Sequence, residues 1–267
     1  MIDTHAHLNF KDFDSDYLEV VKDSVKNGVE IIINIGSDFK TSEKAIKIAG
    51  ENGICYAAVG IHPIHPDRVG GMKEEEIFEK LVNLAKEKKI VAIGETGLDY
   101  YHLPDEVNKK EMLMARQKGL FKIHFKIAKK LNLPLILHCR DAYNDLLSIL
   151  NAQGRKDWAG VIHCFCGSLE IARRFLDAGF YIGFTGMVTY PGNENLSQVI
   201  REIPLEKILV ETDCPYLPPQ EKRGERNLPY YVKYVIQYIA QIKGLDYKEM
   251  EKTLSKNATN AFNLSII

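Results

Sequence analysis

The run VEIIINIGS, residues 29–37, is apolar at most positions and rich in β-branched side chains. A strand buried on both faces has this composition, whereas a half-solvated strand alternates apolar and polar residues. Other short runs along the chain share this character: residues 1–8, 54–62, 89–99, 133–139, 160–165, 179–186 and 207–214. Buried strands of this kind, when helices separate them, predict a parallel sheet.

Segments with helical periodicity separate the runs. In GLFKIHFKIAKKL, residues 119–131, apolar side chains recur at the spacing of an amphipathic helix. Further predicted helices cover residues 14–27, 40–51, 73–88, 141–151, 168–178, 193–202, 228–243 and 246–263. Eight strand–helix alternations favour an α/β fold of the (β/α)₈ TIM-barrel type, as a single domain over residues 1–267. An open doubly wound sheet is the alternative, but it usually has fewer strands and often carries a glycine-rich phosphate loop after the first strand, which we do not find.

The composition restricts the class of protein only loosely. The 35 Lys and Arg residues nearly balance the 36 Asp and Glu residues, so the net charge of −1 neither favours nor excludes a polyanionic partner. The five cysteines, at 55, 139, 164, 166 and 214, form neither a disulfide framework nor a paired zinc motif. We find no signal-peptide pattern and no apolar run long enough for a bilayer, so we expect a cytoplasmic protein without membrane association or an obligate protein partner.

Histidines and carboxylates gather at the predicted strand ends, where TIM barrels carry their active sites. These residues are His5, His7, His62, Glu95, His138, His163 and Asp213. Because side chains alternate along a strand, His5 and His7 share one face and Ala6 points to the other. The same rule predicts that Cys139, Cys164 and Cys214, which each follow one of these residues, face the helices as small buried apolar side chains.

Buried carboxylates and imidazoles are costly without partners, and a divalent cation satisfies several of them at once. Four histidines and two carboxylates exceed the needs of one tetrahedral zinc ion, so we expect two ions that share a carboxylate. Nitrogen and oxygen ligands suit zinc, magnesium, manganese or iron. The first and last strands of a closed barrel are neighbours, which predicts one ligand set of His5, His7 and Asp213. The other set is His138 with His163, and Glu95 is the bridge.

Eight motifs, in chain order, resemble those of the TatD family of metal-dependent hydrolases, within the wider group of amidohydrolase-like barrels. They are MIDTHAHL, AVGIHP, AIGETGLDYY, LPLILHCRDA, HCFCG, YIGFTG, ETDCPYLPP and RGERNLP. The resemblance covers nearly the whole chain. It implies one metal ion held by His5, His7, Glu95 and Asp213 and a second held by Glu95, His138 and His163. It also places His62 and Arg140 near the substrate. His124 stands where the family commonly has Gln, and we expect a change of packing or of the surface there.

The resemblance further implies a deoxyribonuclease, often with 3′–5′ exonuclease activity, whose substrate is single-stranded DNA or a strand end. We expect two metal ions to activate a bridging hydroxide that attacks the phosphorus in line. Besides their metal contacts, Glu95 and Asp213 are the predicted catalytic residues, with Asp213 orienting the nucleophile and moving its proton. In the loop 218–229, Arg223 and Arg226 either bind flanking phosphates or are solvated loop charges.

Two other functions are compatible with the same residues. A carboxyl-ester or amide hydrolase, such as an aminoacyl-tRNA deacylase, could use the same hydroxide on a carbonyl carbon. A metal-stabilised scaffold without catalysis is disfavoured, because structural zinc sites are coordinatively closed whereas these residues are predicted at an open barrel mouth.

Deletion of residues 1–8 is predicted to remove a core strand together with half of a ligand set. We expect loss of the cooperative thermal transition in circular dichroism and loss of bound metal in elemental analysis. A shortened protein that melts as the full chain does and keeps its metal would contradict the prediction.

Overall fold

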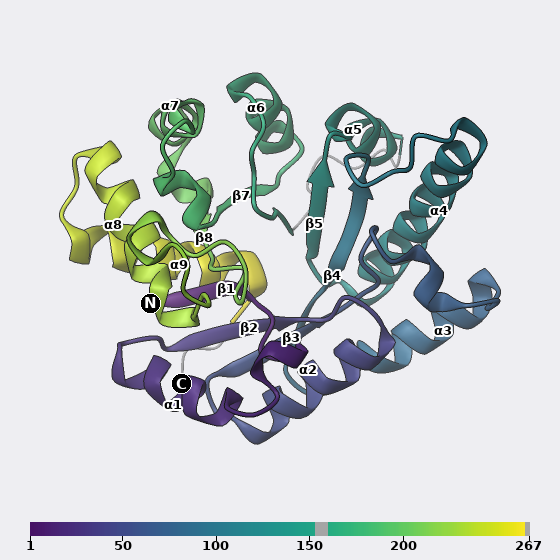
Figure 1. The fold of residues 1–267 in the computed structure, drawn as a ribbon, viewed down its shortest axis with the longest axis horizontal. Helices are drawn as coiled ribbons and strands as arrows, with labels where there is room; N and C mark the ends of the chain where they lie inside the picture. The colour runs from purple at the N-terminus through teal and green to yellow at the C-terminus, as the bar shows by residue number, and fades with distance from the viewer. Residues whose placement is uncertain (153–159, 265–267) are drawn as a thin grey trace.

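The computed structural model describes residues 1–152 and 160–264, and in these ranges it shows one sheet of eight parallel strands in the order β1 to β8 (Figure 1). The strands are β1 (Ile2–Ala6), β2 (Ile31–Ile35), β3 (Cys55–Val59), β4 (Ile90–Asp99), β5 (Leu135–Arg140), β6 (Gly160–Ile162), β7 (Tyr181–Phe184) and β8 (Ile208–Val210). A bridge between Ala6 and Cys214 joins the two ends of the sheet. The predicted (β/α)₈ TIM barrel is therefore confirmed.

Helices follow the strands and surround the sheet (Figure 1). They are α1 (Tyr17–Lys26), α2 (Phe39–Glu51), α3 (Glu74–Leu84), α4 (Val107–Leu131), α5 (Tyr143–Asn151), α6 (Leu169–Asp177), α7 (Glu194–Glu202), α8 (Val232–Lys243) and α9 (Tyr247–Phe262). Helix α4 begins twelve residues before its predicted start at 119. Its first half is rich in Lys, Glu, Met and Gln, which favour helix, but it lacks the apolar period that the prediction relied on. Over residues 1–152 and 160–264, no helix is both long and apolar enough to cross a membrane.

The apolar residues of the sheet divide into two groups because side chains alternate along each strand. Ile32 packs in the large cluster between the strands and the helices, whereas its neighbours Ile31 and Ile33 belong to a second cluster. That second cluster also contains Leu209 of β8 and Phe262 of α9. Inward-facing apolar residues and α9 thus fill one end of the barrel, which leaves the C-terminal ends of the strands for the polar residues.

His124 ties α4 to the end of β3 and is buried, not on the surface. Its Nε2 accepts a hydrogen bond from the N–H of Ile61 at 2.8 Å, and its Nδ1 donates to the carbonyl of Leu120 at 2.7 Å. Burial lowers the pKa of His124 to about 4, so the ring is neutral, as these two bonds require. The departure from the family at position 124 therefore affects packing. His124 is buried and is hydrogen-bonded to the residue that precedes His62.

We predict that His124→Leu destabilises the fold by about 1–3 kcal/mol, because it leaves the Ile61 N–H buried without an acceptor. His124→Gln retains an acceptor and should lose less. Urea denaturation at pH 7 measures the difference. Equal stability of the two variants would contradict the assigned bond.

The folded-state pKa of His124 lies below its unfolded value near 6.5, so the unfolded chain takes up the proton first as the pH falls. Stability from this group is therefore complete above pH 6.5 and is lost toward pH 4. Between pH 7 and pH 5 we expect His124 to account for a loss of about 2 kcal/mol of the wild-type stability. The loss should be smaller in His124→Gln, and an unchanged pH dependence of denaturation in that variant would disprove the assignment.

Candidate metal centre

The first predicted ligand set meets where β1 and β8 end. The Nε2 atoms of His5 and His7 lie 3.2 Å apart. Oε2 of Glu95 lies 3.4 Å from Nε2 of His5, and Oδ1 of Asp213 lies 3.3 Å from Nε2 of His7. Asp213 adopts the left-handed backbone region with φ 57°, a strained conformation of the kind found at functional sites. Two imidazoles and two carboxylates thus share one centre.

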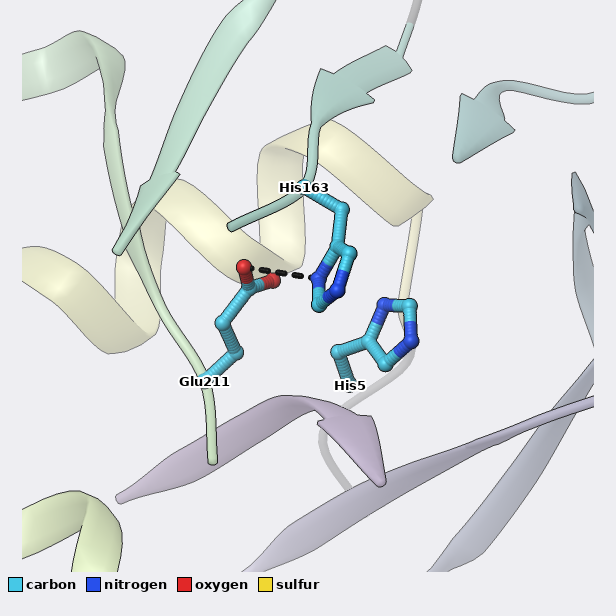
Figure 2. A group of neighbouring side chains, drawn as sticks. All are labelled: His5, His163 and Glu211. Atoms are coloured by element: carbon cyan, nitrogen blue, oxygen red, sulfur yellow. Dashed lines mark ion pairs between the residues drawn. The ribbon is translucent and has the colours of Figure 1, made fainter. Parts of the chain in front are cut away.

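The second predicted set adjoins the first. Nδ1 of His138 lies 3.1 Å from Oε1 of Glu95, while Nε2 of His163 lies 3.9 Å from that oxygen and 3.7 Å from Oδ1 of Asp213. The rings of His5 and His163 stack with their centroids 3.5 Å apart (Figure 2). The structure therefore brings all six predicted ligands together, and Glu95 directs one carboxylate oxygen toward each set.

The close pairing of β4 with β5 requires a glycine beside this carboxylate. Gly97 pairs with His138 across the two strands and has φ 137°. A Cβ at position 97 would lie 2.1 Å from the carbonyl oxygen of His138. The glycine of the GETGLD motif therefore lets the strand that carries Glu95 approach the strand that carries His138.

An acceptor outside the centre fixes the tautomer of His7. Its Nδ1 lies 2.9 Å from the carbonyl oxygen of Ile35, which can only accept, so Nδ1 carries the hydrogen. The Nε2 lone pair then faces Asp213 and Glu95. This is the arrangement of metal-binding histidines, whose second ring nitrogen donates to a carbonyl or carboxylate.

Two buried carboxylates orient His138 and His163 in the same manner. Nε2 of His138 lies 2.8 Å from Oδ2 of Asp99, and Nδ1 of His163 lies 2.8 Å from Oε1 of Glu211 (Figure 2). Each ring therefore has its remaining nitrogen directed at the shared centre. Ring nitrogens and carboxylates that converge in this way need a positive charge between them, which a proton or a cation can supply. The residues present fit a divalent cation with nitrogen and oxygen ligands.

His62 directs a hydrogen, not a lone pair, toward the centre. Its Nδ1 accepts a hydrogen bond from the N–H of Ile64 at 3.1 Å, and its Nε2 lies 3.3 Å from Oε1 of Glu95. Burial lowers the pKa of His62 to about 4, so the ring is neutral and the hydrogen resides on Nε2. His62 thus presents a donor toward the centre, although its position next to Glu95 and His138 is also within reach of a metal ion.

Neighbouring groups shift the pKa values of Glu95 and His163 toward the charged form of each side chain. Burial raises the pKa of Glu95, but His62 and His5 counteract it and hold the carboxyl well below its usual range. Burial lowers the pKa of His163, but Glu211 and Asp213 oppose it and raise the value to about 10. His163 therefore carries a proton at neutral pH, which a bound cation would displace. Glu95 is therefore ionised at neutral pH, as a cation ligand must be.

A cavity of about 590 Å³ opens over the centre, and its lining includes His62 and Arg140, the two residues that the family resemblance places near the substrate. Arg140 places its guanidinium over the ring of Tyr101, 3.7 Å from the centroid. The other two predicted phosphate-binding residues lie elsewhere. Arg226 pairs with Asp16 on the surface, and Arg223 lies over the ring of Tyr190. Neither side chain belongs to the described residues that line the cavity.

The cysteine prediction is right for two residues and wrong for the third. Cys139 and Cys214 belong to the buried apolar cluster behind the strands, although Cys139 also reaches the cavity wall. Cys164 lines the cavity, with its Sγ 3.4 Å from Oγ1 of Thr185 and 3.7 Å from Sδ of Met187. Strand β6 ends at Ile162 and Cys164 has φ 46°, so strand alternation no longer holds there.

Sequence reasoning missed Asp99 and Glu211, which orient two of the histidines. The signal was present in the predicted strands 89–99 and 207–214, because Asp99 lies four residues after Glu95 and Glu211 lies two residues before Asp213. Positions an even number apart share a face of a strand. Both side chains are fully buried. Glu211 also accepts a hydrogen bond from the N–H of Cys164 at 2.6 Å.

A barrel whose mouth gathers imidazoles and carboxylates in this way is typical of metal-dependent hydrolases. Comparison with known proteins agrees. YabD of Bacillus subtilis, named an uncharacterized metal-dependent hydrolase, is 38% identical over 265 residues, which cover 99% of this chain and 100% of YabD. A family model described as TatD related DNase matches residues 2–263. The chain belongs to the TatD family of metal-dependent hydrolases.

Other relatives include a named nuclease and a solved structure. A protein of Escherichia fergusonii named 3'-5' ssDNA/RNA exonuclease TatD is 32% identical over 273 residues, which cover 99% of this chain and 100% of that protein. The crystal structure of YJJV, a TatD homolog from Escherichia coli K12, has a TM-score of 0.88 at 30% identity and covers 99% of this chain and 98% of its own. The similarity thus extends over the whole barrel.

We predict that Glu211→Gln weakens divalent-metal binding about 10- to 100-fold, because it removes the charge that orients and polarises His163. Calorimetric titration of metal-free protein measures the change. Glu206→Gln, at an exposed position before β8, is the control and should bind as the wild type does. Equal affinity in both variants would show that Glu211 does not act on His163.

Proposed function

We propose that the protein is a deoxyribonuclease that uses two divalent metal ions to hydrolyse phosphodiester bonds at the 3′ end of a single strand. His5, His7, Glu95 and Asp213 would hold one ion, and Glu95, His138 and His163 the other. The name of the Escherichia fergusonii relative supports the substrate class and the direction. The metal-dependent hydrolase family supports the type of chemistry.

The geometry of Glu95 carries the two-ion proposal. Its Oε2 lies 3.4 Å from His5 and 3.9 Å from His7, whereas its Oε1 lies 3.1 Å from His138 and 3.9 Å from His163. A carboxylate whose two oxygens face separate groups of imidazoles suits a bridge between two cations. A single ion would leave one of these groups without a partner.

When bound, divalent ions would lower the pKa of a water molecule and withdraw negative charge from a phosphoryl group. The protein's own groups complete the site. Asp213 orients the attacking water and accepts its proton, since its carboxylate lies at the centre and is ionised. Burial raises the pKa of Asp213, but His163 lowers it below its usual value, which keeps the carboxylate charged. His62 donates from Nε2 to a non-bridging oxygen, and Arg140 pairs with a neighbouring phosphate.

We predict that the protein, stripped of metal by a chelator and reconstituted with Mg²⁺, Mn²⁺ or Zn²⁺, shortens single-stranded DNA from its 3′ end. Oligonucleotides labelled at the 5′ end should give a ladder, and chelator should abolish it. Glu95→Gln should lower the rate at least about 100-fold, because it removes the charge shared by both ions. The matched control Glu202→Gln changes an exposed carboxylate of α7 and should act as the wild type does.

Three substrates compared side by side decide the class of reaction. DNA, an RNA oligomer and an aminoacyl ester are incubated with the same metal-loaded protein. Hydrolysis of the ester alone would replace the nuclease proposal by the deacylase alternative. Normal turnover by a folded Glu95→Gln protein, checked by circular dichroism, would refute the bridging role.

A further inference from the structure

Two aromatic side chains line the cavity on the side where β8 meets β1. Phe10 follows β1, and its ring stacks on His7 with centroids 4.2 Å apart and planes 16° apart. Tyr216 follows β8, and its ring lies at 66° to that of Phe10 with centroids 6.2 Å apart. Tyr216 keeps 52% of its surface exposed. A large ring that remains half-exposed in a cavity wall offers a face to a flat apolar ligand.

The backbone of Tyr216 is held firmly although its ring is exposed. Its N–H donates to the carbonyl of Asp213 at 2.9 Å, and its carbonyl accepts a hydrogen bond from Nδ2 of Asn227 at 2.6 Å. Asn227 is fully buried and also donates to the carbonyl of Thr212. The backbone from which the ring extends is therefore set relative to Asp213, which lowers the entropy cost of stacking a ligand on Tyr216.

The opposite wall of the cavity is polar. Arg140 at the end of β5 and His102 after β4 line it. Among the described lining residues, Arg140 is the one arginine, and there is no lysine. Strands β4 and β5 lie across an eight-stranded barrel from β8 and β1. The aromatic pair and the cation therefore flank the histidine–carboxylate centre from two sides.

A cavity of about 590 Å³ has the size of a small-molecule pocket and not of a groove for a duplex. An aromatic side, a hydrolytic centre and a cationic side match three successive parts of a strand end: the last base, the scissile phosphate and the next phosphate. Aromatic rings bind any base by its face, so such a subsite accepts a terminal nucleotide with little regard to sequence.

We infer that Phe10 and Tyr216 form the binding subsite for the base of the terminal nucleotide, while Arg140 receives the next phosphate along the strand. The inference rests on the proposed nuclease function and adds the orientation of the substrate to it. The released nucleotide leaves from the β8–β1 side, and the remaining strand extends past β5.

The fluorescence of a base analogue at the 3′ end of the DNA reports stacking directly. Metal-loaded protein is titrated into a short single-stranded DNA whose 3′-terminal base is 2-aminopurine and whose last linkage is a hydrolysis-resistant phosphorothioate. Stacking on the tyrosine ring quenches the fluorescence of 2-aminopurine. Tyr216→Leu removes the ring but keeps an apolar side chain, and Tyr216→Phe is the matched variant that keeps the ring.

The wild type and Tyr216→Phe should quench the fluorescence, and Tyr216→Leu should lose most of the quenching. For hydrolysable DNA, Tyr216→Leu should raise KM about 5- to 100-fold, the range expected for one lost base–aromatic stack. With an abasic 3′-terminal residue the KM values of wild type and Tyr216→Leu should converge, because no base remains to stack.

The two proposals fail in different ways. If the wild type degrades DNA but Tyr216→Leu keeps both the quenching and the KM, the base subsite is disproved and the nuclease function stands. If the wild type quenches 2-aminopurine, Tyr216→Leu does not, and no oligonucleotide is hydrolysed, the subsite is supported and the nuclease function is refuted. Absence of both quenching and hydrolysis in the wild type overturns both.

Discussion

Two backbone hydrogen bonds between the ends of the sheet hold the candidate centre together. The N–H of Asp213 donates to the carbonyl of His5, and the N–H of His7 donates to the carbonyl of Cys214, both at 2.8 Å. They close the barrel between β8 and β1, and they set the Asp213 carboxylate beside two imidazoles from the other end of the chain. The same segment holds Tyr216 at the cavity wall, so closure of the sheet positions both the centre and the proposed base subsite.

Partners outside the centre decide what four of its histidines can do. The carbonyl of Ile35 and the carboxylate of Asp99 accept the hydrogen of one ring nitrogen in His7 and His138. Glu211 forms an ion pair with Nδ1 of His163. In each of these rings the other nitrogen is then directed inward. In His62 the backbone N–H of Ile64 occupies the lone pair, which leaves a donor facing Glu95. The first three histidines are therefore oriented to bind a metal ion, whereas His62 is oriented to donate a hydrogen bond.

Much of this could be predicted from local patterns. The β-branched runs located all eight strands, and strand alternation correctly placed His5 and His7 together with Ala6 behind them. Strand alternation failed beyond the end of a paired strand, and helical periodicity failed where a helix has no apolar face. Cys164 lies beyond the last paired residue of β6 in a left-handed conformation, so its side chain enters the cavity. The first half of α4 has helix-forming residues but no apolar face, so periodicity did not reveal it.

The sequence by itself determined which residues could chelate a cation and at which strand ends they lie, because side-chain chemistry and the two-residue period of a strand are local properties. Only the tertiary structure decided which nitrogen of each histidine faces inward, that His124 links α4 to β3, and that Arg226 binds Asp16 instead of lining the cavity. Those outcomes depend on which acceptors and charges lie within about 3 Å of a side chain, and the partners come from distant parts of the chain.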